Sequence, residues 1–226
     1  MHQKIMQLVH ARKGHFLLES GHHGDLWLDL ELLCLHPEQV QPFASELAKR
    51  LASHRLEAVC GPLVEGAFVA LLVAAELGVE FFYTERIETE DSENLFSVSY
   101  RLPAALWRKV QGKRIAIVND VVNAGSAVRG TYADLQSHGA QTVAVAALLI
   151  LGDSAEQLAK DWNVDLVRIT SQPNAYWTPS ECPLCAAGMP VEPHGGDGSQ
   201  WKVIDANDLM SRGDQFLDEI SCNKPR

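Results

Sequence analysis

The residues of this chain best suited to chemistry lie in one stretch, 115–131 (IAIVNDVVNAGSAVRGT). Four apolar residues lead into Asn119 and Asp120, and a small-residue turn follows. The turn comprises Asn123, Ala124, Gly125, Ser126 and Ala127, and a helical pattern begins within it. Backbone N–H groups at the start of a helix bind phosphate, and a neighbouring carboxylate can accept hydrogen bonds from ribose hydroxyls. The stretch therefore predicts a site for a sugar phosphate.

A second turn of interest comprises Gly61, Pro62, Leu63, Val64, Glu65 and Gly66. It separates a short apolar strand pattern at 58–60 from a strongly apolar helical pattern at 66–77. Glycines in such a turn let the backbone approach a diphosphate closely. Glu65 opposes this function, because its carboxylate repels an anion. Taken alone, the turn suits an ordinary strand–helix connection equally well.

Strand and helix patterns alternate along most of the chain, which predicts an α/β fold with a central, mainly parallel sheet and flanking helices. We expect helices at 3–12, 37–54, 66–77, 126–138 and 154–162, and strands at 16–20, 26–30, 58–60, 80–84, 115–118, 142–150 and 164–170, with 85–113 irregular. Ligands bind such sheets beyond the carboxyl ends of the strands. Both turns lie at such ends.

The pattern divides the chain into a main domain at 1–171, which includes a small N-terminal hood at about 1–36, and a C-terminal tail at 172–226. The tail contains the sequence CPLC, a glycine-rich stretch and a helix-like segment from about 206 to 220. We expect the tail to pack on the main domain.

The composition excludes several classes of protein. The chain has 226 residues, 46% of them hydrophobic, and a formal net charge of −10. It lacks the overall basic charge that nucleic-acid binding requires, and it has no apolar run suited to a membrane span. The first residues are amphipathic and do not resemble a signal peptide. We expect a cytoplasmic protein that binds neither nucleic acid nor membrane.

Five cysteines, an odd number, argue against a disulfide framework. Cys182 and Cys185 in CPLC have the spacing of half a zinc site, Zn²⁺ being the metal that such pairs bind. Its other ligands would come from His194, Cys222, His22, His23 or a second subunit. The alternative, which the sequence favours, is a pair of packed, reduced thiols. His22 and His23 are expected to face solvent on a hairpin.

Three segments, in this order, resemble orotate phosphoribosyltransferases among the type I phosphoribosyltransferases. Residues 14–29 resemble the hood segment, with matches at Gly14, Phe16, Leu18, Ser20 and Gly21 and with Trp27 near its aromatic position. Turn 61–66 resembles the diphosphate loop, and Gly61, Pro62 and Gly66 match. Residues 119–126 (NDVVNAGS) resemble the signature for phosphoribosyl diphosphate (PRPP).

The resemblance implies a type I phosphoribosyltransferase fold, a homodimer and transfer of ribose 5-phosphate from PRPP to a nucleobase with release of diphosphate. It implies Mg²⁺ bound with the diphosphate. It assigns catalysis to Asp120 and Asn119, the 5′-phosphate to residues 123–127, and the diphosphate to turn 61–66 with Arg86. The base-binding residues would be Phe16, Ser20, Gly21 and Trp27.

Three departures from the family pattern concern charge. The loop after the fourth strand is acidic where the family has lysines, Asn119 replaces an acid, and no arginine follows strand 142–150. These departures predict low or absent turnover with orotate. They also leave open an alternative, a weak or inactive relative that binds PRPP or a nucleotide as a regulatory or assembly protein.

Overall fold

The computed structural model describes residues 1–18, 21–89 and 97–192. The chain forms two compact units: unit 1 comprises Met1–His10 and Leu30–Pro173, and unit 2 comprises Ala11–Asp29 and the residues from Asn174 onward. The domain boundary that the sequence places at residue 171 stays a prediction.

Unit 1 is built on a six-stranded sheet with the order β5-β4-β3-β6-β7-β8. The strands are β3 (Ala58–Pro62), β4 (Glu80–Thr89), β5 (Ser97–Arg101), β6 (Arg114–Val122), β7 (Gln141–Leu151) and β8 (Asp165–Gln172). All neighbouring pairs are parallel except β4 and β5, which pair antiparallel at one edge. The predicted α/β class with a mainly parallel sheet is therefore confirmed.

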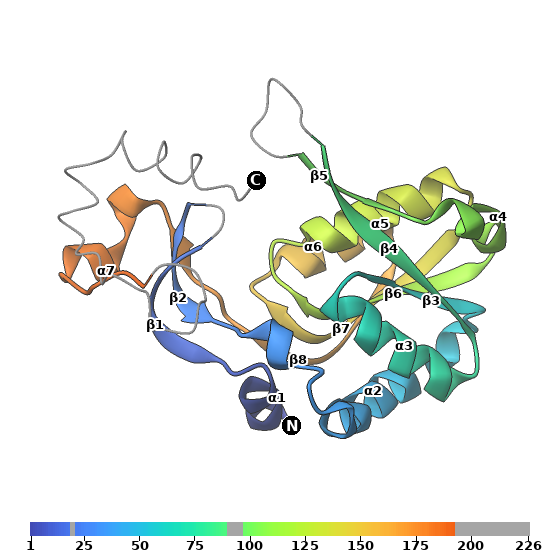
Figure 1. Cartoon of the computed structure of the whole chain (residues 1–226), viewed down its shortest axis with the longest axis horizontal. Coiled ribbons are helices and arrows are strands. Elements are labelled where there is room, and N and C mark those ends of the chain that lie inside the picture. Colours follow the sequence, from blue (N-terminus) through green and yellow to red (C-terminus); the bar gives the residue numbers. More distant parts are fainter. Residues whose placement is uncertain (19–20, 90–96, 193–226) are drawn as a thin grey trace, which may run out of the picture. The chain divides into compact units, whose positions relative to one another are not determined.

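Helices cover both faces of this sheet (Figure 1). One face carries α1 (His2–Leu8), α2 (Pro37–Leu51) and α3 (Glu65–Leu77), and the other carries α5 (Ser126–Ser137) and α6 (Ser154–Trp162). The local sequence explains several helix ends. Pro37 begins α2, where its missing N–H has no cost, and Gly78 ends α3 with φ of +67°.

The two central strands, β6 and β7, are buried along almost their whole length. Their apolar side chains pack with those of α5 in one core cluster that includes Ile115, Ile117, Leu135 and Val145. Full burial of such a side chain contributes about 1.5–3 kcal/mol. The core therefore holds β6 rigidly, and with it the polar residues near its carboxyl end.

Most predicted elements of unit 1 are present, but two predictions were wrong. Strand β6 does not stop before Asn119 but continues to Val122. Part of the region expected to be irregular, 85–113, forms the antiparallel ribbon of β4 and β5, followed by a short helix α4 (Trp107–Val110). The ribbon is an exposed edge, so polar residues occupy it without the apolar pattern that marks a buried strand.

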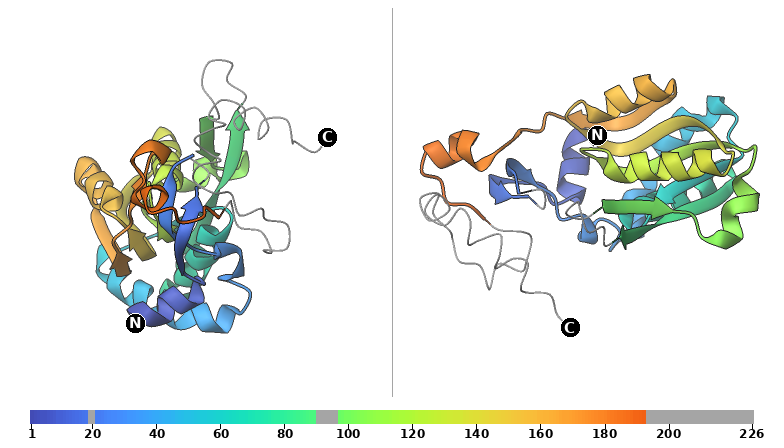
Figure 2. Two further views of the ribbon diagram at one scale, coloured as in Figure 1. Left: turned by 90° about the vertical axis from the view of Figure 1, so that its left-hand side faces the viewer. Right: turned by 90° about the horizontal axis from the view of Figure 1, so that it is seen from above.

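Unit 2 contains an antiparallel sheet with the order β1-β2-β9, formed by β1 (Arg12–Leu17), β2 (His23–Trp27) and β9 (Tyr176–Trp177). A short helix, α7 (Pro183–Ala186), follows (Figure 2). The expected hairpin at the N-terminus is confirmed, although β1 and β2 each begin about three or four residues earlier than predicted. The charged residues Arg12 and Lys13 do not fit an apolar strand pattern, so the start of β1 was predicted too late.

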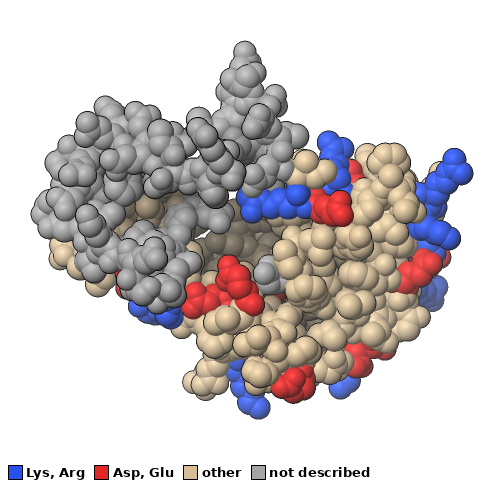
Figure 3. All heavy atoms as spheres, viewed as in Figure 1, with Lys and Arg blue, Asp and Glu red and all other residues tan. Residues whose placement is uncertain are grey.

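Acidic and basic side chains are interspersed over the visible face of the described residues (Figure 3). No helix in the described ranges is both long and apolar enough to span a membrane.

Candidate active site

The carboxyl end of β3 lies between the middle of β4 and the last third of β6. Pro62 at the end of β3 pairs with Thr84 in β4, and the N–H of Leu63 donates to the Thr84 carbonyl at 2.9 Å. On the other side, Ala58 pairs with Ile115 and Cys60 with Ile117, so the same register places Pro62 beside Asn119. The two turns that the sequence singles out therefore lie at the same end of the sheet, beyond the carboxyl ends of β3 and β6.

Asn119 and Asp120 lie inside β6, three and two residues before its end, and are 7% and 4% exposed. The Asn119 side chain donates from Nδ2 to the carbonyl of Val121 at 2.9 Å. This hydrogen bond fixes the orientation of the amide, whose oxygen is directed elsewhere. Asp120 is thus the carboxylate of this segment that the core holds at the carboxyl edge of the sheet.

Turn 123–127 joins β6 to α5. Gly125 takes the position before the first helical residue with φ of +79°, a conformation that favours glycine. A Cβ there would also lie 2.6 Å from Cδ1 of Leu158. Because Gly125 has no side chain to cap α5, the first amides of this 12-residue helix are suited to an external anion.

Turn 61–66 joins β3 to α3 and is packed too tightly for side chains at its glycines. A Cβ on Gly61 would lie 2.6 Å from Cβ of Ala70 and 2.7 Å from Cα of Ala67. Val64 is exposed, and the Leu63–Val64 peptide is cis. Glu65 is the first residue of α3.

Turn 61–66 meets the side chain of Asn119, in strand β6, at Gly66. A Cβ added to this residue would overlap Oδ1 of Asn119, and it would also lie 3.2 Å from Cγ of Pro62. Position 66 therefore requires glycine, because the side chain of Asn119, which replaces the first acid of the family's signature, fills the space beside it. The contact makes one continuous surface from two segments that are more than 50 residues apart in sequence.

Buried polar contacts fix α5 behind this surface. The hydroxyls of Thr84 and Thr131 are 2.7 Å apart, and both residues are fully buried. Asp134, which is 4% exposed, accepts a hydrogen bond from the N–H of Leu102 at 2.7 Å. These contacts tie α5 to β4 and to the segment after β5, so they hold the start of the helix in place.

Two arginines of unit 1 are paired with acids. Arg101 forms an ion pair with Asp134 at 3.5 Å, and Arg168 forms one with Glu156 at 2.7 Å. Arg86 lies exposed on β4 opposite Tyr100. Three acids of the acidic loop, Glu90, Asp91 and Glu93, lie outside the residues that the structure describes.

The predicted base-binding residues belong to unit 2. Phe16 is buried, and its ring lies 5.9 Å from that of Trp27, whose Nε1 donates to Asp29 at 2.7 Å. Gly21 is exposed with φ of +76°, as the hairpin requires. Ser20 lies outside the described residues, and the base-binding role of this set stays a prediction.

Unit 2 contains a cluster of potential metal ligands that the sequence predicted only in part. One potential ligand atom from each of His15, His23, Cys182 and Cys185 lies within 4.8 Å of all the others, and we call these residues the Cys–His cluster. His23 was a named candidate, whereas His15 was not. The expectation that His23 faces solvent was wrong, because the side chain is fully buried. His194 and Cys222 lie outside the described residues.

Burial determines the protonation of several groups. It lowers the pKa of His23, with repulsion from His15 and His22 adding to the effect. It raises the pKa of Cys185 to about 11, with Cys182 adding to the effect. It also raises the pKa of Cys60 well above that of an ordinary thiol, with the charge of Asp134 contributing. Cys60 is therefore a core thiol and not a nucleophile.

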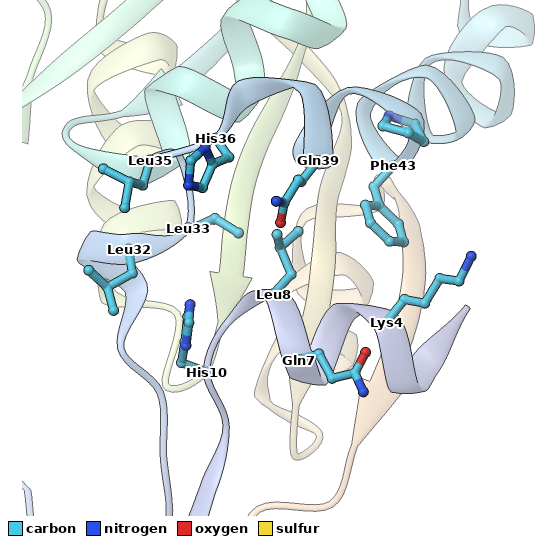
Figure 4. Close-up of a pocket in the computed structure, with 11 residues that line it drawn as sticks. Lys4, Gln7, Leu8, His10, Leu32, Leu33, Leu35, His36, Gln39 and Phe43 are labelled. Carbon is cyan, nitrogen blue, oxygen red and sulfur yellow. The ribbon is translucent and has the colours of Figure 1, made fainter.

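A cavity of about 650 Å³ lies elsewhere in unit 1, between α1 and the segment leading into α2 (Figure 4). Its lining includes Lys4, Leu8, Leu33, His36 and Phe43. It contains no residue of either turn, and its walls carry no carboxylate among the lining residues. We assign it no part in the chemistry.

Comparison with known proteins agrees with this geometry. Residues 38–184 match the family described as phosphoribosyl transferase domain. Proteins named orotate phosphoribosyltransferase include one from Caldanaerobacter subterraneus, 29% identical over 84% of this chain and 94% of that protein. Another, from Carboxydothermus hydrogenoformans, is 32% identical over 79% of this chain and 87% of that protein.

Solved structures share the fold. The orotate phosphoribosyltransferase of Aeropyrum pernix superposes with a TM-score of 0.58 at 22% identity, covering 76% of this chain and 93% of that chain. An adenine phosphoribosyltransferase from Thermoanaerobacter pseudethanolicus gives 0.57 at 16% identity, covering 76% of this chain and all of that chain. On the extent of the family match, the chain belongs to the phosphoribosyl transferase domain family.

Proposed function

We propose that this chain transfers the ribose 5-phosphate of PRPP to a nucleobase of the orotate type and releases diphosphate. The observation that carries the proposal is the contact between Gly66 and Asn119. It places turn 61–66 against β6, the strand that leads into turn 123–127, as a donor with a 5′-phosphate and a diphosphate requires. The relatives named orotate phosphoribosyltransferase support the choice of acceptor.

In the proposed reaction a ring nitrogen of the base forms a bond to C1 of the ribose and loses its proton to the solvent, while the bond from C1 to the diphosphate oxygen breaks. The amides of turn 123–127 hold the 5′-phosphate, and turn 61–66 holds the diphosphate with the help of Arg86. Asp120 accepts hydrogen bonds from the ribose hydroxyls. Its negative charge also stabilises the positive charge that develops at C1.

The residues present are compatible with Mg²⁺. This ion binds through one or two carboxylates together with phosphate oxygens and water. Asp120 supplies one carboxylate near the carboxyl end of β6, where the two turns lie. When bound with PRPP, Mg²⁺ would neutralise charge on the departing diphosphate. Asn119 can offer only an amide oxygen, which already packs against Gly66.

One observation favours the alternative, a PRPP- or nucleotide-binding protein with little turnover. Asn119 carries no charge, and its side-chain amide donates a hydrogen bond to the Val121 carbonyl. Among the described residues, Arg101 and Arg168 are paired with acids. Such a protein would keep the two turns and lose the cationic groups that assist departure of the diphosphate.

The test combines turnover and binding. Diphosphate release from PRPP is measured with orotate, uracil, adenine and guanine in the presence of Mg²⁺, and PRPP binding is measured by calorimetry. We expect turnover with one pyrimidine and, for orotate, a rate below about 1 s⁻¹, against about 10 s⁻¹ for a median enzyme. PRPP binding without turnover would support the alternative, and absence of PRPP binding would contradict both.

A homodimer and a cytoplasmic location form part of the proposal. Val64, Phe68 and Leu71 project from one side of α3 and are 53%, 45% and 49% exposed, a spacing and exposure that suit contact with a second copy. Light scattering should give the mass of a dimer, and Phe68→Glu should give that of a monomer.

The proposed cytoplasmic location agrees with the state of the cysteines. The described cysteines are free thiols, as is usual in a reducing compartment.

A further inference from the structure

Four side chains that bind soft metals converge within unit 2. They come from β1, from β2 and from the segment around α7, and they are separated by up to 170 residues in sequence. From this convergence we propose that His15, His23, Cys182 and Cys185 form a structural zinc site. The proposal does not depend on the function assigned to unit 1, because all four residues belong to unit 2.

The donor set matches zinc. Two thiolates and two imidazoles are a common tetrahedral set for structural Zn²⁺, and Cys182 and Cys185 have the usual spacing of two intervening residues. With Zn–S near 2.3 Å and Zn–N near 2.0–2.1 Å, tetrahedral ligand atoms should lie about 3.3–3.8 Å apart.

The measured separations approach those values. The Sγ atom of Cys182 lies 3.4 Å from Nε2 of His15, and the Sγ atom of Cys185 lies 3.7 Å from the same nitrogen. The Sγ atom of Cys185 lies 3.2 Å from Nδ1 of His23, and the two nitrogens are 2.9 Å apart. Only a slight expansion of the cluster is needed to seat one ion.

The same distances oppose a two-iron cluster of the Rieske type, which also uses two cysteines and two histidines. In that cluster the cysteines and the histidines bind different iron atoms. Here both thiols lie within 3.7 Å of one imidazole nitrogen. A single ion is the occupant that the geometry allows.

A neighbouring backbone group orients His15 for this role. Its Nδ1 lies 2.8 Å from the carbonyl oxygen of Met189, so Nδ1 carries the proton and donates it. The lone pair of Nε2 is then directed at His23 and the two sulfurs. Metal-binding histidines characteristically make such a hydrogen bond through the nitrogen that does not bind the metal.

The site would stabilise unit 2. Its buried apolar side chains are few, with Phe16, Leu26 and Val191 the principal ones among the described residues. A small module with little core commonly requires a metal or disulfides. The ion would join the hairpin of β1 and β2 to the segment that contains α7, and the four protein ligands would leave no open position for catalysis.

The alternative is a cluster of reduced thiols and imidazoles held by hydrogen bonds. The zinc content of the full-length chain, purified without a histidine tag or chelators, is measured by inductively coupled plasma mass spectrometry. We expect one zinc per chain. The double variant Cys182→Ser/Cys185→Ser should lose it, and Cys34→Ser, which changes a cysteine outside the cluster, should retain it. Wild-type protein without zinc, even after incubation with Zn²⁺, would overturn the proposal, as would full retention in the double variant.

A second measurement requires no variant. Wild-type protein is stripped of metal and titrated with Co²⁺, and its absorption spectrum is recorded. Thiolate-to-cobalt charge-transfer bands together with the intense visible bands of a tetrahedral ion would support the site. A spectrum of hexahydrated Co²⁺ at all ratios would overturn it, even if the double variant fails to fold.

Discussion

The candidate active site of unit 1 and the Cys–His cluster of unit 2 are built on opposite principles. In the proposed active site, the backbone of turns 61–66 and 123–127 would supply most of the contacts to the ligand, and glycines leave room for close approach. In the cluster, side chains supply every contact and the backbone only orients them. The comparison shows how differently two sites in one chain depend on their residues.

This difference sets what each site tolerates. A site made of amides survives many side-chain changes but is sensitive to an added Cβ. A site made of four ligands fails when one ligand is removed, because the remaining three cannot complete the coordination. Substitutions in the two sites should therefore differ in effect, and the largest loss of activity is expected at Asp120.

Asp120→Asn addresses the side chain on which the active site depends most. We expect kcat/KM to fall by at least about 100-fold, since a buried charge that stabilises the transition state is lost. The matched control is Asp161→Asn, which removes an exposed carboxylate from α6. An Asp120→Asn variant with the activity and PRPP affinity of wild type would remove Asp120 from the site.

Gly66→Ala addresses the contact between turn 61–66 and Asn119 of strand β6. The added Cβ must displace Asn119, and such overpacking costs about 1–3 kcal/mol of unfolding free energy. PRPP affinity should fall with it. The double variant Gly66→Ala/Asn119→Ala should recover much of the lost stability in denaturant unfolding. Equal losses in both backgrounds would show that Gly66 and Asn119 are not coupled.

Thr131→Val addresses the support behind turn 123–127. The change leaves the Thr84 hydroxyl buried without its partner, at a cost of about 1–3 kcal/mol. Thr84→Val/Thr131→Val should be closer to wild type in thermal unfolding, because both polar groups are then absent. A double variant less stable than the single one by the full cost of a second loss would contradict the hydroxyl pairing.

Asn119→Asp should have the smallest effect. It restores the acid of the family's signature, but the cations of the family's loop are still missing, so turnover should rise less than about tenfold. Steady-state assays with orotate and Mg²⁺ would measure it. A rise of 100-fold or more would show that Asn119 alone limits the enzyme.

The sequence predicted most of unit 1 because its signals are local. Helices α5 and α6 were placed within one residue, since the apolar spacing and flanking residues mark them directly. The ribbon of β4 and β5 was missed because its exposed residues lack a buried pattern. Strand β6 was placed too short because polar Asn119 and Asp120 interrupt an otherwise apolar run, although the core buries both.

The candidate sites were predictable to different degrees for the same reason. Each turn is contiguous in sequence, so residue types alone indicated both of them, but the contact between Gly66 and Asn119 could be found only from the fold. The cluster combines residues far apart in the chain, so the sequence indicated the CPLC pair, offered His23 as one of several candidate partners and missed His15. The signal that could have added His15 is the hairpin, where Leu17 pairs with His23 and His15 lies two residues along the same strand.

The most direct test of the central claim is a crystal structure of the chain soaked with PRPP and Mg²⁺. We expect the 5′-phosphate at the amides of turn 123–127 and the diphosphate along turn 61–66, with the ribose hydroxyls within hydrogen-bonding distance of Asp120. PRPP bound at another surface, while both turns are accessible in the crystal, would contradict the account.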